Sequence, residues 1–336
     1  MLSENTTNDR IGEDLEDMKK KLNLYADKGR IIESDKVRTE PIIAVKPDKS
    51  KIKPLKKIES YDGRFLAVDC STRTLKRANN WGIYLLRTVY ALVKEHNVDW
   101  GYEETIRTTI GNVRTRHLFL EDVRRELESE MACNVVRKLA SGDYILLDGS
   151  AFFGGYQKFR VSLYEKCEKE EIRLITVSKR SPMLCDERGR DFVAATHLLS
   201  ADPMWIYHPI RKANKDEHLY GDVCVAKLCD VSPRIFRCDI MEYLLVHYEP
   251  QELLSPLTFL AEDPRCLGYI VPLWLAHDFS APSNSKLLEY HDRVEETLAI
   301  AGLLDVVRIE ELSYNFPDEL HGIKRAYERE LWSDYV

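Results

Sequence analysis

The feature that most constrains the fold is a short, unbroken apolar run, "YILL" (residues 144–147), which ends on Asp148. A run this short is typical of a strand, and apolar character on both of its faces is typical of a central or parallel strand. A strand of that kind needs helices or other strands on both sides of its sheet. The run therefore predicts a layered fold with this strand near the middle.

The segments around this strand predict a mixed α/β order. In chain order, the predicted elements are strands at 64–71 and 81–95, a helix at 120–139, a strand at 144–148, a helix at 159–171 and a strand at 173–181. The later strands are expected to be parallel, because helices connect them. Beyond residue 200 we expect strands at 241–248 and 267–277 and a helix at 283–302. The fold class predicted is a mixed sheet flanked by helices, with C-terminal additions.

Residues 1–60 are highly charged and poor in aromatic side chains. Part of this segment suits an amphipathic helix, and "VKPDKSKIKPLKK" has the prolines and lysines of a linker. We expect a helical or extended arm over 1–60, either an interaction arm or a solvated tail, and one core domain over 61–336.

The composition is that of an ordinary globular protein, with 44% apolar and 31% charged residues. The sequence has no apolar run of the ~18 residues that a membrane span needs, and no signal-peptide core, so a cytoplasmic protein is expected. The eight cysteines show no CxxC pair, which favours reduced thiols over a zinc site. A net charge of −7 argues against a surface coated with phosphate-binding residues, although 49 Lys and Arg allow a local basic groove.

Two aspartates come directly after apolar strands. Asp69 ends "RFLAVD" and Asp148 ends "YILLD", each before a small residue. Ends of adjacent parallel strands lie ~5 Å apart, and two carboxylates that close favour a cation between them. Oxygen ligands of this kind suit Mg²⁺ or Mn²⁺. Either aspartate alone is equally typical of a turn, but the pair predicts a site.

Further site residues are expected from elements packed over these strands. The helix at 120–139 offers three glutamates, Glu126, Glu128 and Glu130; the first and third share a face, and Glu130 is the one expected against the sheet. His277, after a strongly apolar run, is a candidate ligand or proton donor. Lys179 is a candidate for stabilising negative charge on a phosphate.

Taken in order, these stretches resemble the NurA family, archaeal and bacterial nucleases of DNA end resection. The family pattern is a strand ending in Asp-Gly-Ser, a second strand, a glutamate helix, a strand "LLDGS", a strand ending near "SK" and a late "GYP…L…AH". The corresponding stretches here are "LAVDCS", "WGIYLLRTVYAL", "RRELESEMACNVV", "DYILLDGS", "ITVSKRS" and "GYIVPLWLAH". The resemblance covers residues from about 60 to 290.

The resemblance implies an RNase H-like fold and Mn²⁺- or Mg²⁺-dependent hydrolysis of DNA by a two-metal mechanism. It implies 5′–3′ end resection in double-strand break repair by homologous recombination, a homodimer, and a HerA-type hexameric ATPase as partner. The residues that would take the family's metal-binding positions are Asp69, Glu130, Asp148 and His277, with Tyr269 as the site tyrosine. The DNA strand, single or at a duplex end, is expected near Arg73, Lys76 and Arg77, and Trp274 is a candidate for base stacking.

One departure and two alternatives remain open. Cys70 stands where the family has glycine, which is tolerable if the backbone there needs no positive φ. A degenerate subunit that serves the ATPase as an adaptor without cutting would also fit this departure. "FLAVDCSTRTLK" is also similar to the first phosphate loop of actin-like kinases and ATPases, although the chain is short for their two halves.

Overall fold

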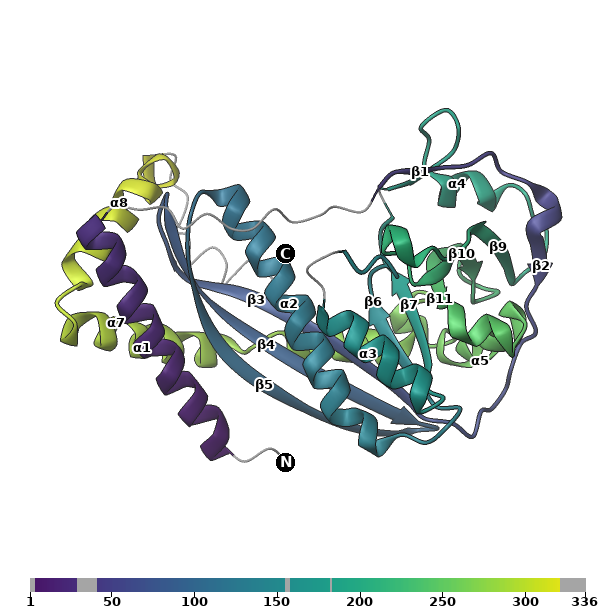
Figure 1. The fold of residues 1–336 in the computed structure, drawn as a ribbon, viewed down its shortest axis with the longest axis horizontal. Coiled ribbons are helices and arrows are strands. Elements are labelled where there is room, and N and C mark those ends of the chain that lie inside the picture. Colours follow the sequence, from purple (N-terminus) through teal and green to yellow (C-terminus); the bar gives the residue numbers. More distant parts are fainter. Residues whose placement is uncertain (1–3, 29–40, 155–157, 182, 321–336) are drawn as a thin grey trace.

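The computed structural model describes residues 4–28, 41–154, 158–181 and 183–320 (Figure 1). Within those ranges, nine strands form one mixed sheet in the order β2-β9-β10-β11-β7-β6-β3-β4-β5, and β1 and β8 form a separate pair. The strands are β1 (Ile43–Ala44), β2 (Ile52–Pro54), β3 (Phe65–Arg77), β4 (Trp81–Lys94), β5 (Asn97–Ile110), β6 (Tyr144–Asp148), β7 (Arg173–Ser178), β8 (Leu184–Cys185), β9 (Trp205–Arg211), β10 (Gly221–Lys227) and β11 (Phe236–Met241). The helices are α1 (Glu4–Lys28), α2 (Val113–Val135), α3 (Lys158–Lys169), α4 (Phe192–His197), α5 (Pro250–Leu260), α6 (Val271–Ser280), α7 (Asn284–Ile300) and α8 (Leu304–Leu320). A mixed sheet flanked by helices, as predicted, is confirmed.

The centre of the sheet is parallel and its two sides are antiparallel. β6 lies between β3 and β7 and is parallel to both, as the sequence predicts for helix-connected strands. β3, β4 and β5 form a long antiparallel meander on one side, and β11, β10 and β9 continue antiparallel on the other. The parallel centre therefore consists of β3, the first strand of the meander, together with β6 and β7.

Helices cover both faces of the meander. Alternate residues of a strand point to opposite faces, so neighbours on β3 meet different helices. Cys70 packs in one apolar cluster with Leu120 and Val123 of α2, whereas the Ser71 hydroxyl donates to the Ser280 carbonyl of α6. Figure 1 shows α2 in front of β3–β5 and α7 behind them. The middle of β3 is therefore enclosed between α2 and α6.

The first helix is docked on the sheet. Ile11 and Met18 of α1 are fully buried against the meander. The Asp14 carboxylate accepts hydrogen bonds from the Thr105 hydroxyl at 2.6 Å, the Ile106 amide at 2.8 Å and the Arg107 guanidinium at 2.6 Å. For residues 4–28 the solvated-tail alternative is thus wrong, while 29–40 of the expected linker lie outside the described residues.

Two strands expected late in the chain are wrong, and several strands, among them β5, β9 and β10, were not predicted. At 241–248, β11 ends at Met241 and a 3-10 turn, η4 (Glu242–Val246), comes next. At 267–277 the chain turns at Gly268, whose φ is +87°, and then starts α6, with Pro272 in the first turn where its missing N–H is harmless. β5 was not predicted because its first half holds no unbroken apolar run: Val98, Trp100 and Tyr102 alternate there with other residues and are exposed.

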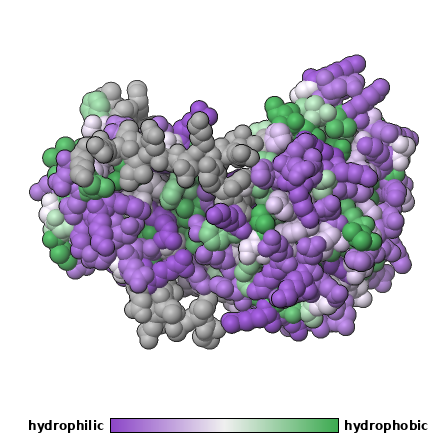
Figure 2. All heavy atoms as spheres, viewed as in Figure 1, coloured by the Kyte–Doolittle hydropathy of each residue, from purple (hydrophilic) through white to green (hydrophobic). Residues whose placement is uncertain are grey.

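Figure 2 shows hydrophilic residues over most of the visible face, with apolar residues scattered among them. Within the described ranges, no helix is long and apolar enough to cross a membrane.

Candidate functional site

The two predicted aspartates occupy matching positions on neighbouring strands. The last paired residues of β3 and β6 are Val68 and Leu147, so Asp69 and Asp148 are the next residues of two adjacent parallel strands. Asp69 is only 4% exposed, and the Asp148 side chain is 30% exposed. The sheet therefore brings the two aspartates to one place, one deep and one at the surface.

Beyond these aspartates the two strands take different courses. β6 ends at Asp148 and the chain turns at Gly149, whose φ is +127°. The sequence predicts a strand over 64–71, but β3 continues past Asp69 to Arg77, paired there with β4 alone. Beyond Val68, β3 thus has no neighbour on its other edge among the described strands; we call this part the free edge of β3.

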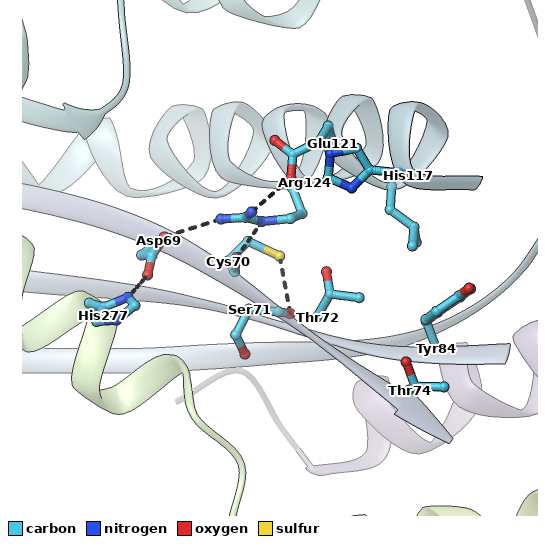
Figure 3. A pocket seen from close by; sticks show the side chains of 11 residues that line it. Asp69, Cys70, Ser71, Thr72, Thr74, Tyr84, His117, Glu121, Arg124 and His277 are labelled. Carbon is cyan, nitrogen blue, oxygen red and sulfur yellow. Dashed lines mark hydrogen bonds and ion pairs between the residues drawn. The ribbon is translucent and has the colours of Figure 1, made fainter. Parts of the chain in front are cut away.

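A pocket of about 360 Å³ lies along this free edge (Figure 3). It is lined by residues of β3, β4, α2 and α6, namely Asp69, Cys70, Ser71, Thr72, Thr74, Tyr84, His117, Leu120, Glu121, Arg124 and His277. The buried aspartate lies at one end of the pocket, so the pocket is the open approach to it.

Asp69 is held between α6 and α2. His277 Nδ1 lies 2.8 Å from Asp69 Oδ2, and Arg124 approaches Oδ1 to 3.8 Å from the other side. Burial acts to raise the pKa of Asp69, but the hydrogen bond and charge of His277, with Lys179 and Arg124, outweigh it and lower that pKa. Asp69 is therefore held as an anion between His277, Lys179 and Arg124.

The glutamate that faces the aspartates is Glu128. It is 6% exposed, and its carboxylate accepts a 2.9 Å hydrogen bond from Arg160 of α3. Burial, with the negative charges of Asp69 and Asp148, raises the pKa of Glu128 to about 7 against the opposing effect of Arg160 and Arg124. Glu130 is exposed on α2, so the expectation that it packs against the sheet is wrong.

The rim of the site carries Lys179 and Tyr269. Lys179 Nζ lies 3.0 Å from Asp148 Oδ2 and 5.5 Å from the centre of the Tyr269 ring. Tyr269 is 6% exposed; burial, with the charges of Asp148 and Asp69, raises its pKa well above the usual range. These contacts bring together five of the six predicted site residues: Asp69, Asp148, His277, Lys179 and Tyr269.

The donor atoms suit a hard divalent cation, although their present arrangement does not form a finished metal centre. Three carboxylates and one imidazole meet here, and the pKa of Glu128 is raised by burial first and then by repulsion from Asp69 and Asp148. Each carboxylate contacts a protein side chain instead, Glu128 with Arg160, Asp148 with Lys179 and Asp69 with His277. Within the described ranges no three His, Cys, Asp or Glu side chains stand close enough to hold an ion. The residues thus provide the ligand types that Mg²⁺ or Mn²⁺ prefers, and binding an ion requires some of these side chains to change rotamer.

The residues expected along the DNA have mixed positions. Lys76 is 2% exposed and paired with Glu295 and Glu311, because β3 extends under α7 and α8, so it is not exposed where the DNA strand was expected. Arg73 and Arg77 are half-buried. Trp274 is partly buried beneath the Arg265 guanidinium, 5.6 Å from its ring centre.

Cys70 fits the site without strain. It lies within β3 and has no positive φ, which meets the condition set for its replacing glycine. Its thiol is buried and accepts a hydrogen bond from Thr88 at 3.3 Å, and burial raises its pKa to about 12. The backbone stays extended past Asp69 as far as Arg77, so the hairpin of β3 and β4 turns at residues 78–80 and not directly after the aspartate.

Two arginines of the site were not anticipated. Arg124 Nε donates a 2.6 Å hydrogen bond to the Cys70 carbonyl at the free edge of β3, and Arg160 is buried against Glu128. Both lie on helices rich in other charges, so no single-sequence signal separates them from solvated arginines. Arg124 stands four residues before Glu128, the spacing of neighbours on one helix face.

Comparison with known proteins agrees with this geometry at the level of the fold. No protein-family profile matches the chain, and no curated protein matches it in sequence. The NurA nuclease from Sulfolobus solfataricus is similar in structure, with a TM-score of 0.55 and 16% identity over 75% of this chain and 88% of that chain. A structure of NurA bound to dAMP and manganese has a TM-score of 0.46 and 12% identity over 84% of this chain and 94% of that chain. The chain therefore has a NurA-like fold, which confirms the resemblance as far as the fold is concerned.

Proposed function

We propose that this protein is a metal-dependent DNA nuclease that hydrolyses phosphodiester bonds in single strands and at duplex ends. The observation that supports this most strongly is the meeting of Asp69, Asp148 and Glu128 at one edge of a NurA-like sheet. Three carboxylates in a partly buried place destabilise the fold by repulsion unless something binds them. A site that retains them is a candidate functional site.

Asp69, Glu128, Asp148 and His277 are the proposed ligands, with Glu128 replacing Glu130 from the sequence analysis. Two divalent ions, when bound, supply an activated water and stabilise the leaving 3′ oxygen. The chain's own residues hold this arrangement: His277 orients Asp69, and Lys179 orients Asp148. Lys179 lies at the rim of the site, where its positive charge could also offset the negative charge of a bound phosphate.

The biological setting is inferred from the resemblance. We propose 5′–3′ resection of DNA ends in double-strand break repair, as a homodimer working with a HerA-type hexameric ATPase. Size-exclusion chromatography with light scattering tests the dimer, and co-elution with the ATPase tests the partner. A monomer that never co-elutes would contradict this part while leaving the chemistry in place.

Cleavage of end-labelled single- and double-stranded DNA with Mn²⁺ or Mg²⁺ tests the activity. We expect wild type and Asp278→Asn to cut, and Asp148→Ala to lose cutting. Asp278 is a matched control, because it is exposed next to His277. Calorimetric titration with Mn²⁺ in the absence of DNA gives a second readout, in which Asp148→Ala should bind more weakly.

Wild type that binds Mn²⁺ but never cuts DNA, even with the ATPase, would favour the adaptor alternative. Wild type that neither binds Mn²⁺ nor cuts would refute the metal-dependent nuclease outright.

A further inference from the structure

The pocket along the free edge of β3 extends beyond the proposed ligands, past Thr72 and Thr74 to Tyr84. The carboxylate site uses Asp69 and His277 at one end of it. The rest of the pocket is formed by β3 hydroxyls on one side and by His117, Glu121 and Arg124 of α2 on the other (Figure 3). A site that bound only metal ions would not need this extension.

Arg124 is placed to bind an anion in this pocket. Its side chain is 32% exposed, and Nε is anchored by the Cys70 carbonyl at 2.6 Å. Its terminal nitrogens lie between three carboxylates: Glu121 at 3.1 Å, Asp69 at 3.8 Å and Glu128 at 4.0 Å. Two of those three contacts are longer than a hydrogen bond, so the guanidinium is not fully used by them.

Thr72 provides an independent observation. Its hydroxyl oxygen is buried and has no hydrogen-bond partner among the described residues. Figure 3 shows Thr72 rising from β3 toward α2, the side on which Arg124 lines the pocket. A buried hydroxyl without a partner destabilises a fold, so an acceptor supplied by a ligand would relieve that penalty.

We propose that Arg124 and Thr72 form a phosphate subsite for the phosphodiester next to the one at Asp69, in a single nucleic-acid strand lying along the free edge of β3. A guanidinium and a hydroxyl are the donors that commonly bind phosphate oxygens. Cation binding at Asp69 and Glu128 would remove two of the partners of Arg124 and leave it to the phosphate. This inference rests on the proposed function and adds to it the path of the strand.

Anisotropy of a fluorescent twelve-nucleotide dT strand, with Ca²⁺ as the cation and a series of salt concentrations, tests the subsite. Arg124→Gln should weaken binding by about tenfold or more, and should lower the slope of log affinity against log salt by about 1. Thr72→Val should weaken binding by about tenfold while leaving the thermal midpoint of the free protein equal or higher, since an unpaired hydroxyl is removed.

Two controls are matched to these variants. Arg125→Gln changes the next residue of α2, which pairs with Asp122 and does not line the pocket. Thr176→Val removes another buried hydroxyl that lacks a partner among the described residues, but on β7 and away from the pocket. Both should bind the strand within about twofold of wild type, because neither touches a phosphate in the proposed path.

The outcomes separate this inference from the proposed function. Wild-type cutting together with unchanged binding in both pocket variants would overturn the subsite alone. Inorganic phosphate that raises the thermal midpoint of wild type but not of Thr72→Val, with equal strand binding in all variants, would assign the pocket to free phosphate and overturn the strand path. Wild type that neither binds nor cuts the strand would refute both.

Discussion

Replacing Glu128 with glutamine should stabilise the metal-free protein while abolishing its proposed DNA cleavage. Glu128 is buried beside Arg160, and a buried ion pair would ordinarily suggest that either partner is needed for stability. The raised pKa of Glu128 contradicts that suggestion, because burial and the two neighbouring aspartates disfavour its charged form more than the two arginines favour it. Glutamine keeps the shape of the side chain and removes the charge.

The magnitude can be worked out from the pKa. A rise from 4.5 to about 7 corresponds to about 3 kcal/mol, since each unit is worth about 1.4 kcal/mol. The neutral form is the favoured one in the fold, so this contribution is present below pH 4.5 and is lost as the pH rises through about 7. Glu128→Gln should therefore unfold like wild type near pH 4.5 and be about 3 kcal/mol more stable near pH 8.

Urea unfolding in EDTA at the two pH values measures this difference, and the DNA cleavage assay measures the accompanying loss. Glu130→Gln is the matched control, two residues along the same helix and exposed, and should change neither quantity. Equal stability of wild type and Glu128→Gln at pH 8 would refute the electrostatic reasoning. Full cleavage activity of Glu128→Gln, with loss in Glu130→Gln, would restore the original assignment of the ligand.

Three further changes test other contacts. Lys76→Met should lower the free energy of unfolding by about 2 kcal/mol, because it removes the lysine partner of Glu311 and one of the two cations that pair with Glu295, the other being Arg308; it should not weaken DNA binding in the anisotropy assay. Asp14→Ala should cost about 2 kcal/mol by removing three hydrogen bonds and should speed hydrogen exchange in α1; unchanged exchange would contradict the docking of that helix. His277→Ala should move acid unfolding to higher pH. The lowered pKa of Asp69 stabilises the fold above pH 3.8, and this stabilisation is lost as the pH falls. The variant removes the hydrogen bond and the charge of His277, which lower that pKa.

The parallel centre of the sheet was predictable because its signal is local. The run before Asp148 is apolar on both faces, and the run before Asp69 is too short for a helix. Their register places the two aspartates together once the strands pair. The length of β3 was not predictable, since its second half is polar and resembles a loop; α7 and α8, far along the chain, cover it.

The choice between Glu128 and Glu130 shows where sequence reasoning reaches its limit. At 3.6 residues per turn, the two glutamates lie about 80° on either side of Leu120, which is in the apolar stripe of α2. The apolar pattern of the helix therefore gives no reason to prefer one of the two glutamates as the one that faces the sheet. Which flank meets the aspartates depends on how α2 crosses the sheet and on α3, which supplies Arg160. That information is tertiary and is absent from the pattern.

The exposure of the cations near Asp69, Asp148 and Glu128 indicates which of these cations can change partner when a ligand binds. Arg160 is 5% exposed and pairs with Glu128 inside the fold, so we expect it to keep its position when a ligand binds. Arg124 and Lys179 are 32% and 37% exposed, each at the open side. Metal ions bound to the carboxylates would displace Arg124 and Lys179 from them, and both side chains are long enough to contact a phosphate instead. Arg124 and Lys179, which pair with these carboxylates in the structure, would then contact the substrate, so the same ion pairs would serve both the stability of the site and the binding of its ligands.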